Sequence, residues 1–381
     1  ENIIHLVLAR TADAPKGTKG IRLFLVPKFE VNDDGSVGSR NGVSTNSIES
    51  KMGIKGSPTC VLNFENSKGI MIGPENKGLS SMFTMMNLER IVVGVQGLGI
   101  AETAYQNAVA YSKERKQGKA NNSTNGETDL IIKHADIRRS LMNMKSIIEG
   151  QRSFAFWLSQ QIDVSLSHDD KDVRNHASNM VALLTPVIKS FFTDNGVEIT
   201  NDAIQVFGGY GYTKDQGIEQ LFRDNRITPI YEGTNSVQAI DLVYRKISSE
   251  GVFENFIKSM DSEIKNYKNE KNLEIFLNIF EKYKEILLSF TKWMRDKMNS
   301  NKDDASAACN DYLKVLGYTA LAFAWIKTLK VSFEKQSANK DFYEDKINTG
   351  KYYFEKILPR AQSHYVVGTS GSHTTMNAKF N

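Results

Sequence analysis

The chain has 381 residues, of which 40% are hydrophobic and 24% charged, and its formal net charge at pH 7 is +4. This length suggests two or three domains with sizeable cores. Because the net charge is small for this length and no apolar run is long enough to cross a bilayer, the composition does not favour nucleic acid or a membrane as the main partner.

The cysteines and the first residues of the chain bear on where the protein works. Cys60 and Cys309 lie in different parts of the chain without metal-ligand spacing, so we expect no metal site and free thiols in a reducing compartment, the cytoplasm. The chain opens Glu1-Asn2-Ile3-Ile4, with no Met or signal peptide and with a strand already under way. We therefore expect it to begin inside a domain.

Residues 1–72 have the pattern of short β-strands. Apolar runs alternate with turn residues, of which 33–36 (Asp-Asp-Gly-Ser) and 40–42 (Arg-Asn-Gly) are the clearest. The expected strands are 3–8, 21–27, 47–51, 59–64 and 69–72. We therefore predict a partial middle β domain, a sheet or small barrel that lacks its early strands.

From residue 73 the apolar period becomes that of a helix, beginning with Leu79, Met82, Phe83 and Met86. The expected helices are 79–113, 130–163, 173–207 and 216–247, and an exposed loop of Gly, Asn and Ser, 118–126, separates the first two. Four long amphipathic helices with short connections predict an antiparallel four-helix bundle over residues 73–248.

The last third of the chain is helical again and contains no glycine-rich or His/Cys group. The expected helices are 253–267, 273–294, 312–333 and 341–367, the last kinked or shortened by Pro359. The small, polar tail, 369–381, is expected to fray. We interpret residues 249–381 as an additional helical domain that stabilises or oligomerises the protein. The predicted fold class is thus mainly α with a partial β domain.

The fourth bundle helix is interrupted at residues 223–235. Pro229 removes a backbone donor and disfavours helical geometry at the residue before it, and Gly233 frees the backbone. Glu232 therefore sits at a helix break, next to the apolar Ile230. Apolar surroundings disfavour the charged form of a carboxylate, as suits a general base, whereas the alternative is a solvated loop glutamate.

This order of elements resembles the acyl-CoA dehydrogenase family, and four motifs carry the resemblance over residues 1–247. They are Tyr231-Glu232-Gly233-Thr234 with Gln238, the glycine turn 205–212 (QVFGGYGY), Asn87-Leu88-Glu89-Arg90, and 112–118 (SKERKQG). Residues 250–381 resemble the extra helical domain of the longer bacterial members, a subgroup that includes 3-methylmercaptopropionyl-CoA dehydrogenase. Residues 51–60 (KMGIKGSPTC) also resemble that subgroup.

The resemblance implies the α,β-dehydrogenation of an acyl-CoA thioester. Glu232 would remove the α proton while the β hydride passes to FAD. Arg90 would face the substrate and the catalytic carboxylate, and Asn87 and Gly233 would contact the substrate. From the local pattern, the alternative for Arg90 is a solvated charge on a helix face.

The resemblance also implies a flavin site shared between subunits, and hence a homodimer or homotetramer. The residues expected to contact FAD are Arg115, Gln117, Gln205, Gly208, Gly209, Thr234 and Ser236. Arginine suits a pyrophosphate as a charge-assisted donor, and glycine lets the backbone approach phosphate closely. For the glycine cluster the alternative is a helix C-cap followed by a turn.

Three functions stay open from the sequence. The first is a dehydrogenase that passes electrons to an electron-transferring flavoprotein; the second is an oxidase that passes them to oxygen. The third is a non-catalytic helical scaffold that has lost its cofactor. Because the stretch that contacts the flavin ring in relatives has no counterpart here, we expect this chain alone to bind flavin poorly.

Overall fold

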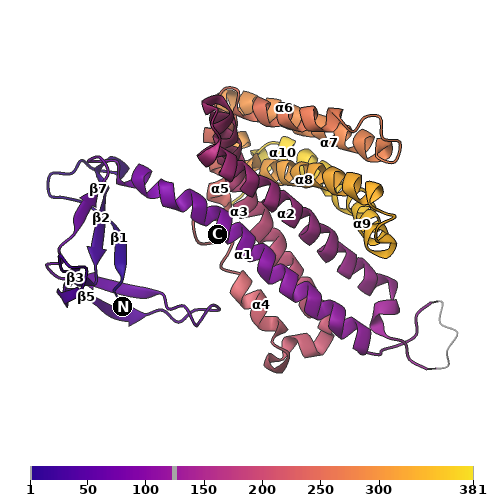
Figure 1. Cartoon of the computed structure of the whole chain (residues 1–381), viewed down its shortest axis with the longest axis horizontal. Coiled ribbons are helices and arrows are strands. Elements are labelled where there is room, and N and C mark those ends of the chain that lie inside the picture. The colour runs from indigo at the N-terminus through magenta and orange to yellow at the C-terminus, as the bar shows by residue number, and fades with distance from the viewer. Residues whose placement is uncertain (1, 122–126, 381) are drawn as a thin grey trace. The chain divides into compact units, whose positions relative to one another are not determined.

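The computed structural model describes residues 2–121 and 127–380, so that part of the loop expected at 118–126 lies outside the described residues. The chain forms two compact units, Glu1–Glu89 and Arg90–Asn381. The first contains short strands and the start of a long helix, and the second is helical (Figure 1). Within the described part of the chain, no helix has the length and apolar character needed to cross a membrane.

The first unit contains antiparallel strands in three small sheets. The sheet orders are β1-β2-β7, β3-β4 and β5-β6, and in the first sheet Leu6 lies opposite Leu25. The strands are β1 (Ile4–Ala9), β2 (Arg22–Pro27), β3 (Phe29–Val31), β4 (Val37–Arg40), β5 (Val43–Ile48), β6 (Cys60–Phe64) and β7 (Ile70–Ile72).

The expectation of a strand over 47–51 is wrong, because β5 begins earlier and its pairing with β6 ends at Ile48 opposite Cys60. Strands β3 and β4 were not predicted. They flank the predicted turn at 33–36, where Gly35 has a φ of 81°. Since each strand has only three or four residues, neither shows a period-two pattern that the sequence could reveal.

The predicted helices of the bundle are present within a few residues. Only three residues separate α2 from α3, and the Asp170 side chain caps α3 by accepting hydrogen bonds from the backbone N–H groups of Asp172 and Val173. The helices are α1 (Gly78–Glu114), α2 (Ala135–Ser167), α3 (Lys171–Phe207), α4 (Ile218–Asn225) and α5 (Asn235–Asp241), with a π-helical segment over Leu242–Ile247.

Further helices complete the second unit. They are α6 (Val252–Lys265), α7 (Glu274–Ser300), α8 (Lys302–Glu334), α9 (Lys340–Tyr352), α10 (Arg360–Thr369) and α11 (His373–Met376). As predicted, the helix expected at 341–367 is broken at Pro359, which lies between the π-helical segment Tyr353–Ile357 and α10.

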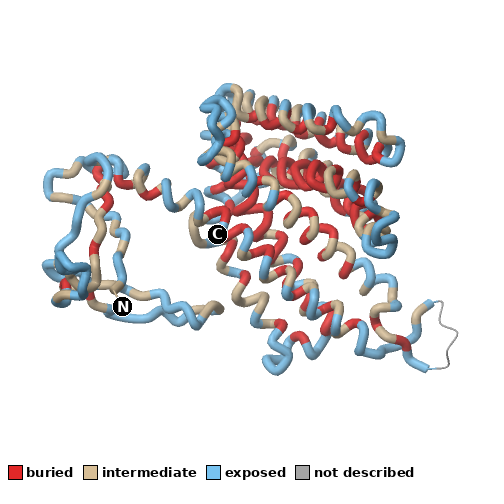
Figure 2. The backbone as a smooth tube through the Cα atoms, in the orientation of Figure 1, coloured by how far each residue is buried: buried red, intermediate tan, exposed pale blue. Residues whose placement is uncertain are grey.

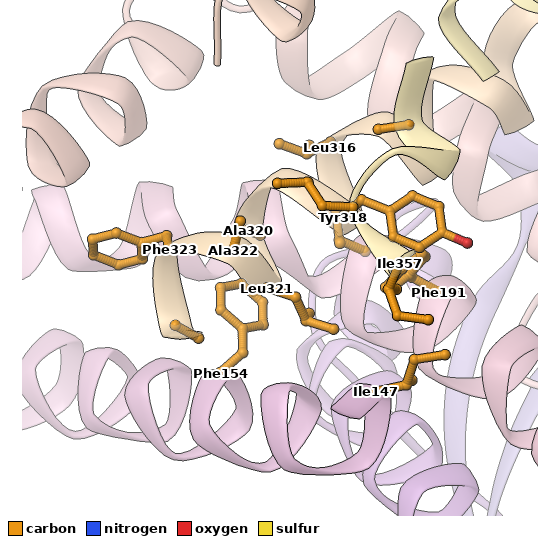
Figure 3. Close-up of a cluster of buried hydrophobic side chains, with 14 of the residues drawn as sticks. Ile147, Phe154, Phe191, Leu316, Tyr318, Ala320, Leu321, Ala322, Phe323 and Ile357 are labelled. Atoms are coloured by element: carbon orange, nitrogen blue, oxygen red, sulfur yellow. The ribbon is translucent and has the colours of Figure 1, made fainter. Parts of the chain in front are cut away.

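Helix α8 is buried on nearly every side and forms the centre of the core (Figure 2). It packs against α2, α3 and α5 and also against α7, α9 and α10. Figure 3 shows Phe154 of α2 near Leu321 of α8, and Phe191 of α3 near Tyr318 of α8, where the two rings meet edge to face with centroids 4.8 Å apart. The helices of the last third therefore share one continuous core with the bundle helices.

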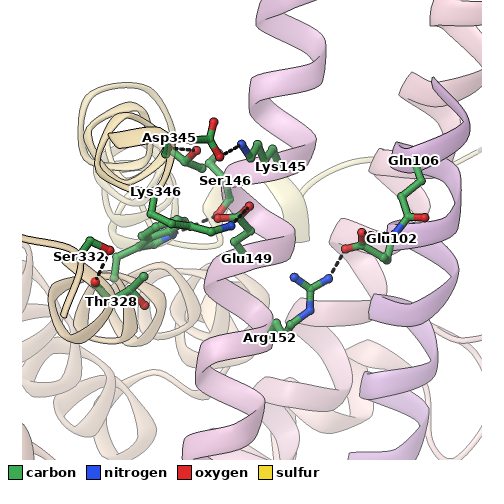
Figure 4. Close-up of polar contacts among 12 residues, drawn as sticks. Glu102, Gln106, Lys145, Ser146, Glu149, Arg152, Thr328, Ser332, Asp345 and Lys346 are labelled. Atoms are coloured by element: carbon green, nitrogen blue, oxygen red, sulfur yellow. Dashed lines mark hydrogen bonds and ion pairs between the residues drawn. The ribbon is translucent and has the colours of Figure 1, made fainter. Parts of the chain in front are cut away.

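Polar contacts join α2 to its neighbours (Figure 4). Lys346 of α9 pairs with Glu149 at 2.7 Å, and Arg152 pairs with Glu102 of α1. The Trp325 indole N–H of α8 donates to the Ser146 carbonyl at 3.0 Å. Because this indole is fully buried, its hydrogen bond satisfies a donor that has no access to water.

The expectation that the whole tail frays is wrong at Ser372, which is buried. Its backbone N–H and its hydroxyl donate to Asp304 Oδ1 at 2.8 and 2.7 Å. Asp304 lies in the first turn of α8 and also pairs with Lys297 at 3.0 Å. Polar composition alone gave no sign of this partner, because it lies far away in the sequence.

Candidate functional site

The loop between α4 and α5 is closed by its own backbone hydrogen bonds. The N–H of Thr228 donates to the Asn225 carbonyl at 3.0 Å, and the N–H of Tyr231 donates to the Ile227 carbonyl at 3.1 Å. The N–H of Asn235 then reaches back to the Pro229 carbonyl at 3.0 Å. The predicted interruption is therefore an ordered turn, and Glu232 lies within it.

Glu232 adopts a left-handed backbone conformation with a φ of 57°, and Gly233 follows with a φ of 87°. For a residue with a side chain this conformation costs about 1–2 kcal/mol. Such strain persists only where the surroundings impose it, and it is common at functional sites. The positive φ of Gly233 favours glycine, and an added Cβ would lie 2.8 Å from Gln238 Nε2, so that the tip of this side chain would have to shift.

Two side chains hold the peptide of Glu232. Arg90 Nε and Gln238 Nε2 each donate to the Glu232 carbonyl oxygen at 3.2 Å. Tyr231, the preceding residue, donates from its hydroxyl to Gln96 Oε1 of α1. The backbone that carries the carboxylate is thus fixed from both α1 and α5.

Arg90 is only 5% exposed, so the alternative of a solvated charge on a helix face is wrong. Burial lowers the pKa of its guanidinium, and the carboxylates of Asp241 and Glu232 oppose this shift. Glu232 itself is half-buried. Its exposure is therefore intermediate between the carboxylate in apolar surroundings expected from the sequence and the alternative of a solvated loop glutamate. Within the described part of the chain its carboxylate forms no hydrogen bond or ion pair, so the side chain is free to turn.

Five residues predicted to contact the flavin line one groove of about 740 Å³. They are Arg115, Gln117, Gln205, Gly208 and Gly209. A Cβ added to either of these glycines would meet no atom within 4 Å, so the turn presents bare backbone to the groove. The alternative of a helix C-cap also holds, because Gly208 ends α3 with a φ of 61°. A C-cap and an open backbone surface are compatible.

Aromatic rings support this groove. Tyr111 and Phe207 stack with their centroids 4.2 Å apart, and the guanidinium of Arg115 lies 5.5 Å from the centroid of the Tyr210 ring. A guanidinium and a stretch of backbone without Cβ atoms therefore line the same groove. This arrangement suits an anion such as a phosphate group.

The structure does not bring the other predicted residues into this groove. Thr234 caps α5, where its hydroxyl accepts a hydrogen bond from the Val237 N–H at 3.4 Å, and Ser236 is exposed in the first turn. Asn87 belongs to the first unit. Lys189 and Asn235 were not predicted from the sequence; Lys189 Nζ donates to Asn235 Oδ1 at 2.9 Å, next to the loop that carries Glu232. The one available signal was a lysine between the apolar Ile188 and Phe191 of α3.

Two known families match successive parts of the helical region. Residues 76–247 match the family described as acyl-CoA dehydrogenase, C-terminal domain. Residues 256–379 match the family described as acetyl-CoA dehydrogenase C-terminal like.

Two curated relatives are similar to most of this chain. The 3-methylmercaptopropionyl-CoA dehydrogenase of Ruegeria pomeroyi is 42% identical over 251 residues, which are 66% of this chain and 42% of that protein. A butyryl-CoA dehydrogenase of Syntrophomonas wolfei is 33% identical over 375 residues, which are 94% of this chain and 61% of that protein. The chain thus spans 42% and 61% of the lengths of these two relatives.

Solved structures show the same fold. Caenorhabditis elegans ACDH-11, in complex with C11-CoA, aligns over 99% of this chain and 61% of its own with a TM-score of 0.74 and 23% identity. A Bacillus anthracis acyl-CoA dehydrogenase complexed with FAD aligns over 98% of this chain and 62% of its own with a TM-score of 0.75 and 19% identity.

Proposed function

Because the chain belongs to the acyl-CoA dehydrogenase family, we propose that it is the part of an FAD-dependent acyl-CoA dehydrogenase that carries the catalytic base. The reaction is the α,β-dehydrogenation of an acyl-CoA thioester. The observation that carries this proposal is the strained, doubly anchored peptide of Glu232 beside the buried Arg90.

Glu232 accepts the α proton of the thioester in this proposal. Arg90 and Gln238 hold its peptide, whereas its carboxylate forms no hydrogen bond or ion pair within the described residues. The backbone of the base is therefore fixed, and its carboxylate can turn. Such an arrangement suits a base that turns toward a bound substrate. Arg90 supplies a buried positive charge next to the Glu232 peptide.

FAD, when bound, supplies the acceptor for the β hydride. The groove of Arg115, Gln117, Gln205, Gly208 and Gly209 would hold its pyrophosphate and adenosine portions. The fit rests on the guanidinium of Arg115 and on the open backbone of the two glycines. We also propose flavin contacts for Thr234 and Ser236 and a substrate contact for Asn87 and Gly233.

We propose an electron-transferring flavoprotein as the acceptor of the electrons, a homodimer or homotetramer that completes the flavin site, and a cytoplasmic location. A non-catalytic scaffold gains no support, because a scaffold has no use for a strained glutamate with an arginine behind it. The oxidase alternative differs only in its electron acceptor, and release of peroxide without a partner protein would identify it.

The test is flavin bleaching of the full-length protein by a panel of acyl-CoA thioesters that includes butyryl-CoA and 3-methylmercaptopropionyl-CoA. We expect at least one thioester to bleach the flavin. Glu232→Gln should keep its flavin and lose turnover by about 10²–10⁴-fold, the usual contribution of a general base.

The matched control for this variant is Glu250→Gln, which changes an exposed glutamate after the π-helical segment and should leave turnover unchanged. Near-normal turnover of Glu232→Gln would refute the assigned base. A full-length protein that binds no flavin would favour the scaffold instead.

A further inference from the structure

A lysine lies fully buried beneath the loop between α4 and α5, here called the Glu232 loop. Lys189, in the middle of α3, has 0% exposure and lies in a stretch of this helix in which Val187, Ile188 and Phe192 are also buried. Within the described part of the chain, its ammonium has one hydrogen-bond acceptor, the Oδ1 atom of Asn235, at 2.9 Å. A buried ammonium with one acceptor is costly, so its presence calls for a reason other than stability.

The Glu232 loop ends at Asn235, the first residue of α5. Residues of α3 form hydrogen bonds with both the nitrogen and the oxygen of the Asn235 side-chain amide. Its Nδ2 donates to Asp194 Oδ1 at 2.7 Å, to Thr193 Oγ1 at 3.0 Å and to the Ser190 carbonyl at 3.2 Å. Its Oδ1 accepts from Lys189. The amide therefore has a single orientation, and among the residues that the structure describes Lys189 is its one charged donor.

The position of Asn235 determines the path of the loop. Its backbone N–H closes the loop onto the Pro229 carbonyl at 3.0 Å. It also begins α5, and Gln238, one turn later, donates to the Glu232 carbonyl. A shift of Asn235 would therefore move both the closing hydrogen bond and one of the two donors that hold the peptide of Glu232.

The charges around Lys189 come from three elements. They are Asp194 of α3, Arg90 of α1 and Glu232 of the loop. Burial lowers the pKa of Lys189 to about 8; Arg90 adds to this shift, whereas Asp194 and Glu232 oppose it. At neutral pH the ammonium therefore carries its charge, close to the proposed base and the proposed substrate-side arginine.

We propose that Lys189 is a positioning residue, whose buried ammonium fixes the Asn235 side chain and thereby the backbone from Pro229 to Asn235 that presents Glu232. The catalytic part of this inference rests on the proposed function, in which Glu232 is the base. The structural part, that Lys189 orders this loop through Asn235, stands independently of activity.

The activity arm compares Lys189→Met, Asn235→Ala and the double variant in the flavin-loaded full-length protein. We expect kcat to fall at least tenfold in each single variant, with KM for the acyl-CoA within about twofold, because a misdirected base slows the proton transfer more than it weakens binding. The double variant should lose no more than the worse single variant, because the two residues act as one unit.

The matched control is Lys284→Met. Lys284 is another buried lysine, 7% exposed, but it pairs with Asp261 and Glu281 in the α6–α7 region at 2.6 Å each. Its removal should leave kcat unchanged. Losses that add up in the double variant, or a Lys189→Met enzyme within twofold of the wild-type kcat, would overturn the catalytic part of the inference.

The structural arm measures hydrogen exchange of the amides between residues 227 and 238. We expect faster exchange there in Lys189→Met and Asn235→Ala, with α3 exchanging as in the wild type. Unchanged exchange would overturn the proposal whatever the activity. If no thioester bleaches the flavin of the wild type, the proposed function is wrong. The hydrogen-exchange measurement still shows in that case whether Lys189 orders the loop. Should Lys189→Met fail to fold, Asn235→Ala alone gives both readouts.

Discussion

At the scale of single residues, backbone conformation and burial distinguish Glu232 and Arg90 from ordinary surface charges. Pro229 and Gly233 predict that the helix stops, but neither indicates that Glu232 itself adopts a φ of 57°. Arg90 could belong to an exposed helix face as far as its neighbours in sequence show. Its burial follows from α5 and the loop, which approach α1 only in the folded chain.

Lys189 gives a prediction about the pH dependence of stability. Burial lowers its pKa from 10.5 in the unfolded chain to about 8 in the folded protein. Below pH 8 both states carry the charge, and the folded state bears the full cost of burying it. Between about pH 8 and 10.5 the unfolded chain binds the additional proton, so this lysine makes the free energy of unfolding rise with pH.

We therefore expect the wild type to gain about 2–3 kcal/mol relative to Lys189→Met between pH 7 and pH 10. Urea unfolding of both proteins at a series of pH values measures this difference. The variant serves as the reference, because tyrosines and other lysines titrate alike in both. Parallel pH curves for the two proteins would contradict a lowered pKa.

At the scale of secondary-structure elements, helix crossings at glycine bring the bundle helices close together. A Cβ added to Gly94 of α1 would lie 2.7 Å from the Ile188 carbonyl oxygen of α3. A Cβ added to Gly196 of α3 would lie 2.9 Å from the Gly97 carbonyl oxygen of α1. Both contacts are with backbone, which cannot move aside as a side-chain tip can. The α1–α3 crossing therefore requires small residues.

The prediction at this scale compares two alanines on one helix. Gly94→Ala should lower the free energy of unfolding by about 1–3 kcal/mol, as overpacking of a core does. Gly99→Ala should raise it by about 0.4–1 kcal/mol, because Gly99 is exposed, has no atom within 4 Å of an added Cβ, and gains helix propensity. Chemical denaturation of both variants provides the measurement. Equal effects would mean that α1 and α3 do not cross at this glycine.

Helix α8 shows why a helix can be found while its extent is underestimated. The sequence predicted 312–333, whereas α8 begins at Lys302. Its N-cap, Asn301, accepts hydrogen bonds from the N–H groups of Asp303 and Asp304, and this signal precedes a stretch with no apolar stripe. The apolar residues that the first turns of α8 bury are small ones, Ala305, Ala308 and Cys309, between exposed positions, so their apolar stripe is too weak to show where the helix starts.

At the scale of the whole molecule, the bundle helices and the last third of the chain share one hydrophobic core, although they match two separate families. Phe154 and Phe191 of the bundle pack against α8 (Figure 3). Gly317 of α8 allows the Phe191 ring to approach, because an added Cβ would lie 2.6 Å from it. Without α8, the apolar faces of α2 and α3 would be exposed to water.

We therefore expect a chain that stops after Gly251 to lack a cooperative thermal unfolding transition and to aggregate. The control stops after Thr369 and removes only the tail that Asp304 fastens through Ser372, so it should still unfold cooperatively, with a lower midpoint. Calorimetry and circular dichroism compare the two chains. A well-folded, cooperative chain ending at Gly251 would mean that the bundle forms a complete core without α8.

The sequence by itself determined most of the helices and several of the strands, the break at Pro229 and Gly233, and the motifs that identified the family. Proline, glycine and the helical period act through neighbouring residues, so these features can be recognised locally. The tertiary structure alone decided that Arg90 is buried, that Lys189 meets Asn235, and that Ser372 is fastened to Asp304. The two contacts join residues far apart in the chain, and the burial of Arg90 depends on distant segments that pack against it only in the folded chain.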